Sequence, residues 1–253
     1  MDIRIVSSLA EPVGKIWVEA QETLVAQQGY FLVSSPLSST PLPIYQWVIE
    51  NAANFTGWEK ARFVLMDEQV EGFTPPFQYV AMDDEASYEN FAQRHLLISL
   101  SHKISRDIPV IKPDLSSIST FELGRPIDLL ILALGIKGNY ANVMPMTQRD
   151  VGWHIAKLIP EFQAVHTQPG SASYAGAQFR EYGMSLGPQQ VLKARKVLVI
   201  ASGEKKRNLV STLASFDHFD PIFPLSIIHD PEVSSRVTVY LTEDIGDAWP
   251  NFT

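Results

Sequence analysis

Two adjacent carboxylic acids, Asp67 and Glu68, stand directly after the apolar run ARFVLM. A carboxyl group at the end of a buried strand can accept a proton from a bound substrate, so this pair could supply a general base. The alternative is an acid that only caps the turn following the strand, which is the more common arrangement. The local pattern leaves both interpretations open.

The stretch SSPLSSTP, Ser34–Pro41, is rich in hydroxyl groups and leads into a helical pattern. Hydroxyls and the free N–H groups at the start of a helix suit a phosphate, and the candidate donors are Ser38, Ser39 and Thr40. The alternative is that Ser39 or Thr40 only caps the helix. No Walker-type lysine follows and no GxGxxG is present, so we expect no nucleotide loop and no dinucleotide or other cofactor.

Basic residues stand at three further places in the chain. Lys137 lies between Gly135 and Gly138 after the apolar run DLLILAL, and Arg180 precedes YGMSLG. The densest basic cluster, Lys205 to Arg207, follows the run KVLVIAS, where Ser202 could cap a helix. This cluster is either part of an anion site or a solvated helical face. No His, Asp or Glu residues have the spacing of a metal site.

These candidates need a scaffold, and the remaining pattern supplies one. Short runs rich in β-branched residues alternate with segments of helical spacing, such as 12–28 and 41–53. Runs without polar alternation indicate strands covered on both faces. We therefore predict an α/β fold, a Rossmann-like three-layer sandwich with a mostly parallel central sheet. The predicted strands are YFLVSS, ARFVLMDE, PIDLLILALG, YGMSLG, KVLVIAS, LSIIHD and VTVYLT. Ligands of such folds bind beyond the carboxyl ends of the strands.

The bulk composition limits the possible functions. The chain has 253 residues, 45% of them hydrophobic and 19% charged, with no cysteine and a formal net charge of −8. We expect residues 1–253 to form a single domain. The negative charge argues against nucleic acid and acidic membranes as partners. Disulfides and thiolate metal sites are excluded, and no signal peptide or membrane-spanning pattern is read, so we expect a cytoplasmic protein.

Several of these segments, in the same order, resemble the glucosamine-6-phosphate deaminases and galactosamine-6-phosphate isomerases. The segments are SSPLSSTPLPIYQWV, FVLMDEQV, Ser87-Tyr88, DLLILALGIKGN with the later Pro145, and YGMSLGPQQVLKARKVLVIASGEKK. The wider superfamily includes the 6-phosphogluconolactonases. The resemblance implies a small-molecule sugar phosphate as partner, and it makes a homo-oligomer possible.

The resemblance also implies roles for single residues. Ser38, Ser39 and Thr40 would meet the phosphate, and Asp67 would move a proton between C1 and C2 of the opened sugar. Lys205 is taken as the lysine of a Gly-x-x-Lys helix start.

One loop departs from the pattern of the family. Lys137 stands where the family has Asp, Asn139 where it has the ring-opening His, and Met144 where it has the supporting Glu. Opening a sugar ring needs groups that exchange protons near neutral pH, which Asn and Met do not do. Glu181 stands where the family usually has a basic residue. A shift of one position would place Arg180 there and give it the phosphate contact.

Three functions follow from this comparison. The first is an amino-sugar-phosphate isomerase or deaminase with an atypical loop, in which Asp67 is the base and Lys137 an electrophile or phosphate partner. The second is a catalytically inactive sugar-phosphate-binding or regulatory protein. The third is a 6-phosphogluconolactonase-like hydrolase, which the replacement of the loop His by Asn139 disfavours.

Overall fold

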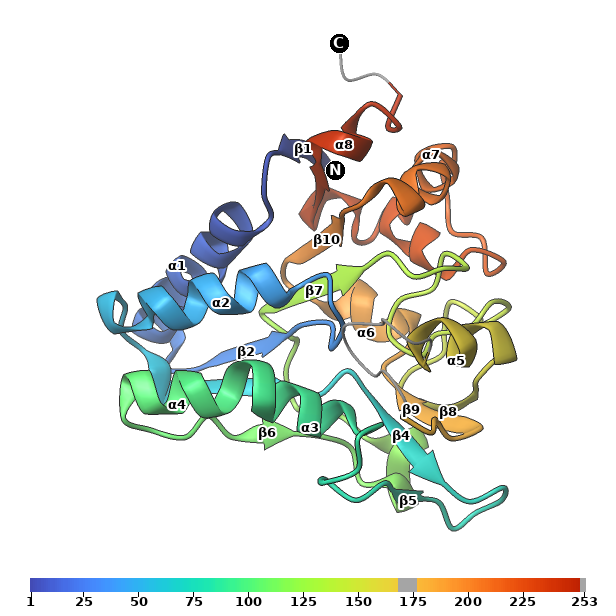
Figure 1. Cartoon of the computed structure of the whole chain (residues 1–253), viewed down its shortest axis with the longest axis horizontal. Coiled ribbons are helices and arrows are strands. Elements are labelled where there is room, and N and C mark those ends of the chain that lie inside the picture. The colour runs from blue at the N-terminus through green and yellow to red at the C-terminus, as the bar shows by residue number, and fades with distance from the viewer. Residues whose placement is uncertain (168–176, 251–253) are drawn as a thin grey trace.

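The computed structural model describes residues 1–167 and 177–250, and its centre is a seven-stranded sheet (Figure 1). All six pairs of neighbouring strands in this sheet are parallel, as predicted. The strands, in spatial order, are β1 (Asp2–Val6), β11 (Val237–Thr242), β10 (Val197–Ala201), β7 (Leu129–Ala133), β2 (Phe31–Ser34), β3 (Ala61–Val64) and β6 (Val110–Ile111).

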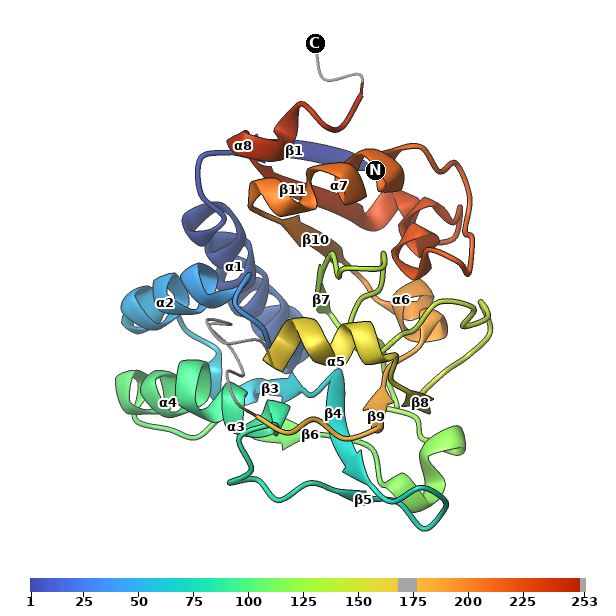
Figure 2. The same cartoon turned by 45° about the vertical axis from the view of Figure 1, so that its right-hand side comes forward.

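Helices cover both faces of this sheet, which gives the predicted three layers. Figures 1 and 2 show α1, α2 and α4 on one face and α6 and α7 on the other. The helices are α1 (Ala10–Gln28), α2 (Leu42–Asn51), α3 (Tyr88–Ala92), α4 (Ile98–Ile104), α5 (Pro160–Thr167), α6 (Pro188–Lys193), α7 (Arg207–Ala214) and α8 (Glu243–Gly246). A π-helical turn, Gln93–Leu97, joins α3 to α4. Every residue of β2 and β10 is buried, which explains why these runs show no polar alternation.

A second sheet, antiparallel and four-stranded, lies beyond the carboxyl end of β3. Its strands, in spatial order, are β5 (Gln78–Tyr79), β4 (Asp67–Glu71), β9 (Tyr182–Ser185) and β8 (His154–Lys157). The chain therefore leaves the central sheet at Val64 and enters the second sheet at Asp67. The run ARFVLMDE was predicted as one strand and is two, and YGMSLG contributes to this second sheet.

Two predictions about strands need correction. The segment LSIIHD was predicted as a strand, but it belongs to a 3₁₀ helix, Pro224–His229. Pro224 fixes the first turn of this helix, and all of residues 224–228 are buried, so the run shows no helical polar face. The N-terminal strand β1 was not predicted, because as an edge strand it carries the exposed charged residues Asp2 and Arg4.

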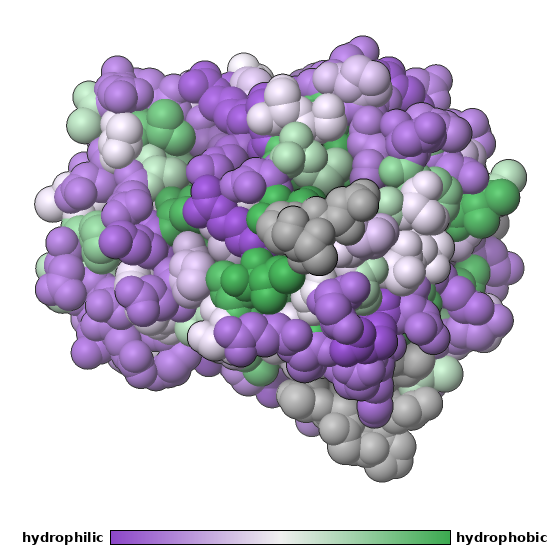
Figure 3. Space-filling model, turned by 90° about the horizontal axis from the view of Figure 1, so that it is seen from above, coloured by the Kyte–Doolittle hydropathy of each residue, from purple (hydrophilic) through white to green (hydrophobic). Residues whose placement is uncertain are grey.

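The outer surface is mostly polar. The face seen in Figure 3 is mostly hydrophilic, with hydrophobic side chains gathered in small patches. Among the described residues, no helix combines the length and the apolar character that crossing a bilayer requires.

Candidate functional site

The strand order puts the switch point of the sheet between the carboxyl ends of β2 and β7, where α/β folds form their ligand-binding crevice. From β2 the chain continues to β3 on one side, and from β7 it continues towards β10 on the other side. Loops that leave adjacent parallel strands in opposite directions open a crevice between them, and α/β proteins bind ligands there. Its two walls are the loop after β2, residues 35–41, and the loop after β7, residues 134–145.

The loop after β2 is anchored at its start and open at its tip. Ser34 Oγ donates to the carbonyl of Val64 over 2.8 Å, and Tyr45 of α2 donates its hydroxyl to Ser35 Oγ over 3.1 Å. Within the described chain, the side chains and backbone N–H groups of the tip residues have no hydrogen-bond partner; these residues are Ser38, Ser39 and Thr40.

The alternative interpretation of the tip, a helix cap, is wrong. The residue at the N-cap of α2 is Pro41, and no side chain caps this helix. The predicted phosphate donors are therefore uncommitted, and they stand at the start of a ten-residue helix, where the helix dipole favours an anion.

Asp67 follows β3, which neighbours β2 on the side away from β7. It is 7% exposed, and its Oδ1 is buried without a hydrogen-bond partner among the described residues. Burial, and then the charge of Glu68, hold the pKa of Asp67 well above its usual range. Burial, and to a smaller extent the charge of Asp67, raise the pKa of Tyr45 in α2 and of Tyr88 in α3. Since Asp67 accepts no bond from a turn, the capping interpretation is also wrong.

Glu68 is in the opposite situation. Its carboxylate accepts bonds from the backbone N–H groups of Gln69, Tyr88 and Glu89, each over 2.8 Å, and from Ser87 Oγ over 3.0 Å. Burial outweighs these bonds and raises the pKa of Glu68 to about 7. Ser87 caps α3 by accepting from the N–H of Asn90. Glu68 therefore anchors the start of α3, which leaves Asp67 as the carboxyl group available to a ligand.

The loop after β7 uses its polar groups on itself. Asn139 is 3% exposed; its Oδ1 accepts from the N–H of Lys137 over 3.4 Å, and its Nδ2 donates to the carbonyl of Ala141 over 3.3 Å. The side chain of Lys137 is exposed to solvent. Met144 is buried in an apolar cluster with Ala156, Leu158 and Phe162. None of these three side chains presents a proton-exchanging group to the crevice.

The basic cluster after β10 contributes a different lysine from the one predicted. Lys205 is exposed, whereas the ammonium group of Lys206 donates to the carbonyl of Leu134 at the end of β7. Burial lowers the pKa of Lys206 to about 8. Lys206 also stands three positions after Gly203, which is the Gly-x-x-Lys spacing, so counting from this glycine would have identified it.

Two further expectations for basic and capping residues differ in the structure. Ser202 does not cap the helical segment after β10, since Gly203 occupies the N-cap and no side-chain bond is made. Arg180 donates to Glu71 over 2.9 Å and to Asp84 over 2.7 Å. Its charge is therefore compensated by two carboxylates, and Glu71 stands four residues along β4 from Asp67.

A buried polar network beside Asp67 was not predicted. Gln69 Nε2 donates to the Tyr88 hydroxyl over 3.1 Å, and this hydroxyl donates to Asn142 Oδ1 over 3.4 Å. Asn142 Nδ2 donates to the carbonyl of Met184 over 3.2 Å. The network connects α3, the loop after β7 and the second sheet. No sequence pattern indicates this network, because its members are far apart in the chain.

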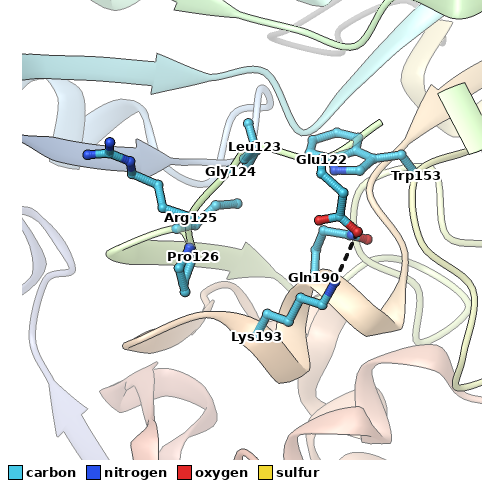
Figure 4. Close-up of a pocket in the computed structure, with 9 residues that line it drawn as sticks. Glu122, Leu123, Gly124, Arg125, Pro126, Trp153, Gln190 and Lys193 are labelled. Atoms are coloured by element: carbon cyan, nitrogen blue, oxygen red, sulfur yellow. Dashed lines mark hydrogen bonds and ion pairs between the residues drawn. The ribbon is translucent and has the colours of Figure 1, made fainter. Parts of the chain in front are cut away.

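A separate pocket of about 230 Å³ lies near the amino end of β7, at the opposite end of this strand from the loop 134–145 (Figure 4). Lys193 and Glu122 form an ion pair over 3.2 Å at its rim, and Trp153 forms one side. The guanidinium of Arg125, 3.6 Å from the centre of the Tyr30 ring, points away from this pair. The pocket therefore does not include the residues of the crevice. Among the described residues, no group of acidic and histidine side chains could hold a metal ion.

Comparison with known proteins supports the resemblance seen in the sequence. No protein-family model matches the chain. It is 25% identical over 235 residues to a glucosamine-6-phosphate deaminase of Lactobacillus acidophilus, covering 89% of this chain and 90% of the relative. It is 27% identical over 229 residues to a glucosamine-6-phosphate deaminase of Leuconostoc citreum, covering 85% and 87%.

Solved structures share the fold at lower sequence identity. A monomeric glucosamine-6-phosphate deaminase superposes with a TM-score of 0.75 at 17% identity, covering 98% of this chain and 100% of the other. A 6-phosphogluconolactonase from Shewanella baltica superposes with a TM-score of 0.67 at 18% identity, covering 95% and 96%. The predicted fold is thereby confirmed.

Proposed function

This chain is a divergent relative of the glucosamine-6-phosphate deaminases, and on that premise we propose that it is an amino-sugar-phosphate isomerase or deaminase. The substrate would lie in the crevice between the loops after β2 and β7. The observation that carries the proposal is Asp67, a buried carboxyl group with a raised pKa and with an oxygen that has no partner among the described residues. A structural acid in that position would be expected to make hydrogen bonds, as Glu68 does.

The phosphate would be held by the tip of the loop after β2 and by Lys206. The hydroxyls of Ser38, Ser39 and Thr40 have no hydrogen-bond partner among the residues that the structure describes. The strands that carry the two phosphate elements, β2 and β10, flank β7. The Lys206 ammonium, at the carbonyl of Leu134, stands at the end of β7 between these two elements. Lys206 replaces Lys205 in this role, and Arg180 keeps its ion pairs outside it.

Asp67 would move the proton. In an open-chain 2-amino aldose, the carboxylate takes the proton from C2 and returns it to C1, while one proton of the C2 amino group passes to O1, so that C1 becomes CH2OH and C2 an imine. Water then hydrolyses the imine to a ketose phosphate and ammonia. A raised pKa suits this cycle, because a general base is most effective when its pKa lies near the working pH. The loop after β7 supplies no ring-opening group, so the substrate would be taken in its open-chain form. Lys137 and Asn139, expected at catalytic positions, would then shape the loop.

A second candidate function is a sugar-phosphate-binding protein without turnover. The observation that favours it is the loop after β7, in which the amide of Asn139 is bonded within the loop and Met144 is buried among apolar side chains. The lactonase alternative has support from the fold of its structural neighbours alone.

The test is to incubate purified protein with glucosamine 6-phosphate and to measure ammonia and ketose phosphate. The proposed enzyme releases both, Asp67→Asn abolishes the release, and Asp83→Asn, a change at an exposed acid nearby, leaves it intact. Unchanged turnover in Asp67→Asn would reject Asp67 as the base. Calorimetric binding of glucosamine 6-phosphate without any turnover would establish the binding protein instead.

A further inference from the structure

Three polar side chains lie in one row across the second sheet. Ser185 of β9 is directly opposite Asp67 of β4 on one side and directly opposite His154 of β8 on the other. Directly opposite residues of antiparallel strands point to the same face, with their Cβ atoms about 4.5–5.5 Å apart. The row therefore places a hydroxyl group between a carboxyl group and an imidazole, although the three residues are widely separated in the sequence.

This face of the sheet is covered by other elements. Ala156, two residues after His154 on the same face of β8, packs against Met144 of the loop after β7 and Phe162 of α5. Figure 2 shows α5 over the junction between the two sheets. Within the row, Asp67 and Ser185 are buried and Nε2 of His154 is inaccessible to solvent.

Both ends of the row carry a buried polar atom without a partner. Oδ1 of Asp67 and Nε2 of His154 are both inaccessible and make no hydrogen bond among the described residues. A buried polar atom without a partner is costly and rare, so each such atom in a native structure indicates an additional partner. Two such atoms on either side of the Ser185 hydroxyl group indicate that this hydroxyl is the partner they share.

The donor and acceptor roles along the row agree with one another. Nδ1 of His154 is 3.0 Å from the carbonyl of Gly152, which can only accept, so Nδ1 carries the hydrogen of the neutral ring. Nε2 is therefore an acceptor. The Ser185 hydroxyl can accept from a protonated Asp67 and donate to Nε2 once it rotates away from the carbonyl of Leu186, to which it now donates over 2.8 Å.

We propose that Asp67, Ser185 and His154 form a proton relay through which Asp67 exchanges the proton that it removes from the substrate. This inference rests on the proposed function of Asp67. In the relay step Asp67 gives its proton to Ser185 Oγ while Ser185 gives its own to His154 Nε2, which yields a carboxylate and an imidazolium with no change in total charge. His154 acts through Ser185 and does not touch the substrate, so it is a positioning residue. It supplies the proton-exchanging group that the loop after β7 lacks.

The first test follows the fate of the substrate hydrogen. Glucosamine 6-phosphate carrying deuterium at C2 is converted in ordinary water, and the fraction of deuterium lost to water is compared with the fraction retained at C1 of the ketose. The relay predicts that His154→Gln and Ser185→Ala each lower this loss about fivefold, the factor expected for removal of one hydrogen bond. A change that only weakens folding lowers turnover without altering this partition.

The matched control is His229→Gln. His229 is also a partly buried imidazole, but its Nε2 already bonds to the carbonyl of Leu213 outside the site. The partition in this variant stays at the wild-type value. An unaltered partition in His154→Gln and Ser185→Ala would overturn the relay while leaving the proposed isomerase intact.

The second test needs no turnover, so it separates the relay from the proposed function. The nitrogen-15 resonance of His154 Nε2 is measured in the wild-type protein, in Ser185→Ala, in Asp67→Leu and in the control Asp83→Asn. A relay shifts this resonance towards that of a free ring nitrogen in the first two variants and leaves it in place in the control. The same resonance in all four proteins would reject the relay, whether or not the protein turns over glucosamine 6-phosphate.

Discussion

The loops after β2 and after β7 form opposite walls of one crevice, yet they use their polar groups in opposite ways. The tip of the first loop leaves the hydroxyls of Ser38, Ser39 and Thr40 without partners within the described chain. The second loop bonds the amide of Asn139 to its own backbone and exposes the side chain of Lys137. The tip of the first loop therefore keeps polar groups that a ligand could bond, whereas the polar groups of the second loop stabilise the loop itself.

The adjacent acids Asp67 and Glu68 repeat this contrast at the scale of two residues. Glu68 accepts four hydrogen bonds, and Asp67 keeps an oxygen without one. The presence of a polar residue near a strand end is thus a poor guide to function. What matters is whether the surrounding backbone already satisfies its hydrogen bonds.

The largest expected effect tests the rigidity of the second loop. Gly138 has φ +69°, and a Cβ there would stand 2.3 Å from the ring of Phe223. We expect Gly138→Ala to lower the free energy of unfolding by about 2–4 kcal/mol, from backbone strain together with overpacking. Urea denaturation measures this loss. Gly124→Ala is the control, because Gly124 has φ +71° and open space around it, so only the strain remains. Equal losses in the two variants would show that the loop is not tightly packed.

The next effect concerns Asn139. Removing its amide leaves the N–H of Lys137 and the carbonyl of Ala141 without their partner, so Asn139→Ala should lower the free energy of unfolding by about 1–3 kcal/mol. The affinity for glucosamine 6-phosphate should stay unchanged in calorimetry. If instead affinity fell while stability held, Asn139 would be a ligand-binding residue and the contrast between the loops would be lost.

The third prediction concerns the charge of Lys206. We expect Lys206→Met to weaken glucosamine 6-phosphate binding about tenfold, or about 1.4 kcal/mol, and Lys205→Met to have no effect. The ammonium is charged below its pKa of about 8 and neutral above it. Wild-type affinity should therefore decline as the pH rises through 8, and the Lys206→Met protein should not show this decline. A tenfold loss in Lys205→Met would restore the residue expected from the sequence.

The lowered pKa of Lys206 also predicts how folding stability depends on pH. Because the folded state lowers the pKa of Lys206 from 10.5, the unfolded chain binds more protons between pH 8 and pH 10.5. The contribution of this group to folding stability therefore rises with pH across that window. The free energy of unfolding of the wild-type protein minus that of Lys206→Met, measured by urea denaturation, should therefore rise from pH 8 to pH 10.5.

The smallest effect tests the open loop itself. Ser38→Ala and Thr40→Val should each weaken glucosamine 6-phosphate binding by about 0.5–1.5 kcal/mol, the value of one hydrogen bond. Neither should change the free energy of unfolding, because no side chain caps α2. A loss of stability of about 1 kcal/mol, with binding unaffected, is the signature of a helix cap and would remove the difference between the loops.

Much of the fold could be predicted from local patterns. The runs that became β2, β7, β10 and β11 were recognised because strands buried on both faces are apolar throughout. The 3₁₀ helix at Pro224–His229 was missed for the same reason, since a short buried run looks alike in either conformation. The second sheet was missed because β9 pairs with β4 and with β8 across long sequence separations.

The sequence by itself determined the buried strands β2, β7, β10 and β11 and the polar stretches that follow the first three, because these depend on patterns within a few residues. Only the tertiary structure decided which of those polar groups are in use. It selected Lys206 over Lys205 by burial, separated Asp67 from Glu68 by hydrogen bonding, and brought Ser185 and His154 into line with Asp67. Burial and cross-strand pairing arise from contacts between distant segments, so no local pattern encodes them.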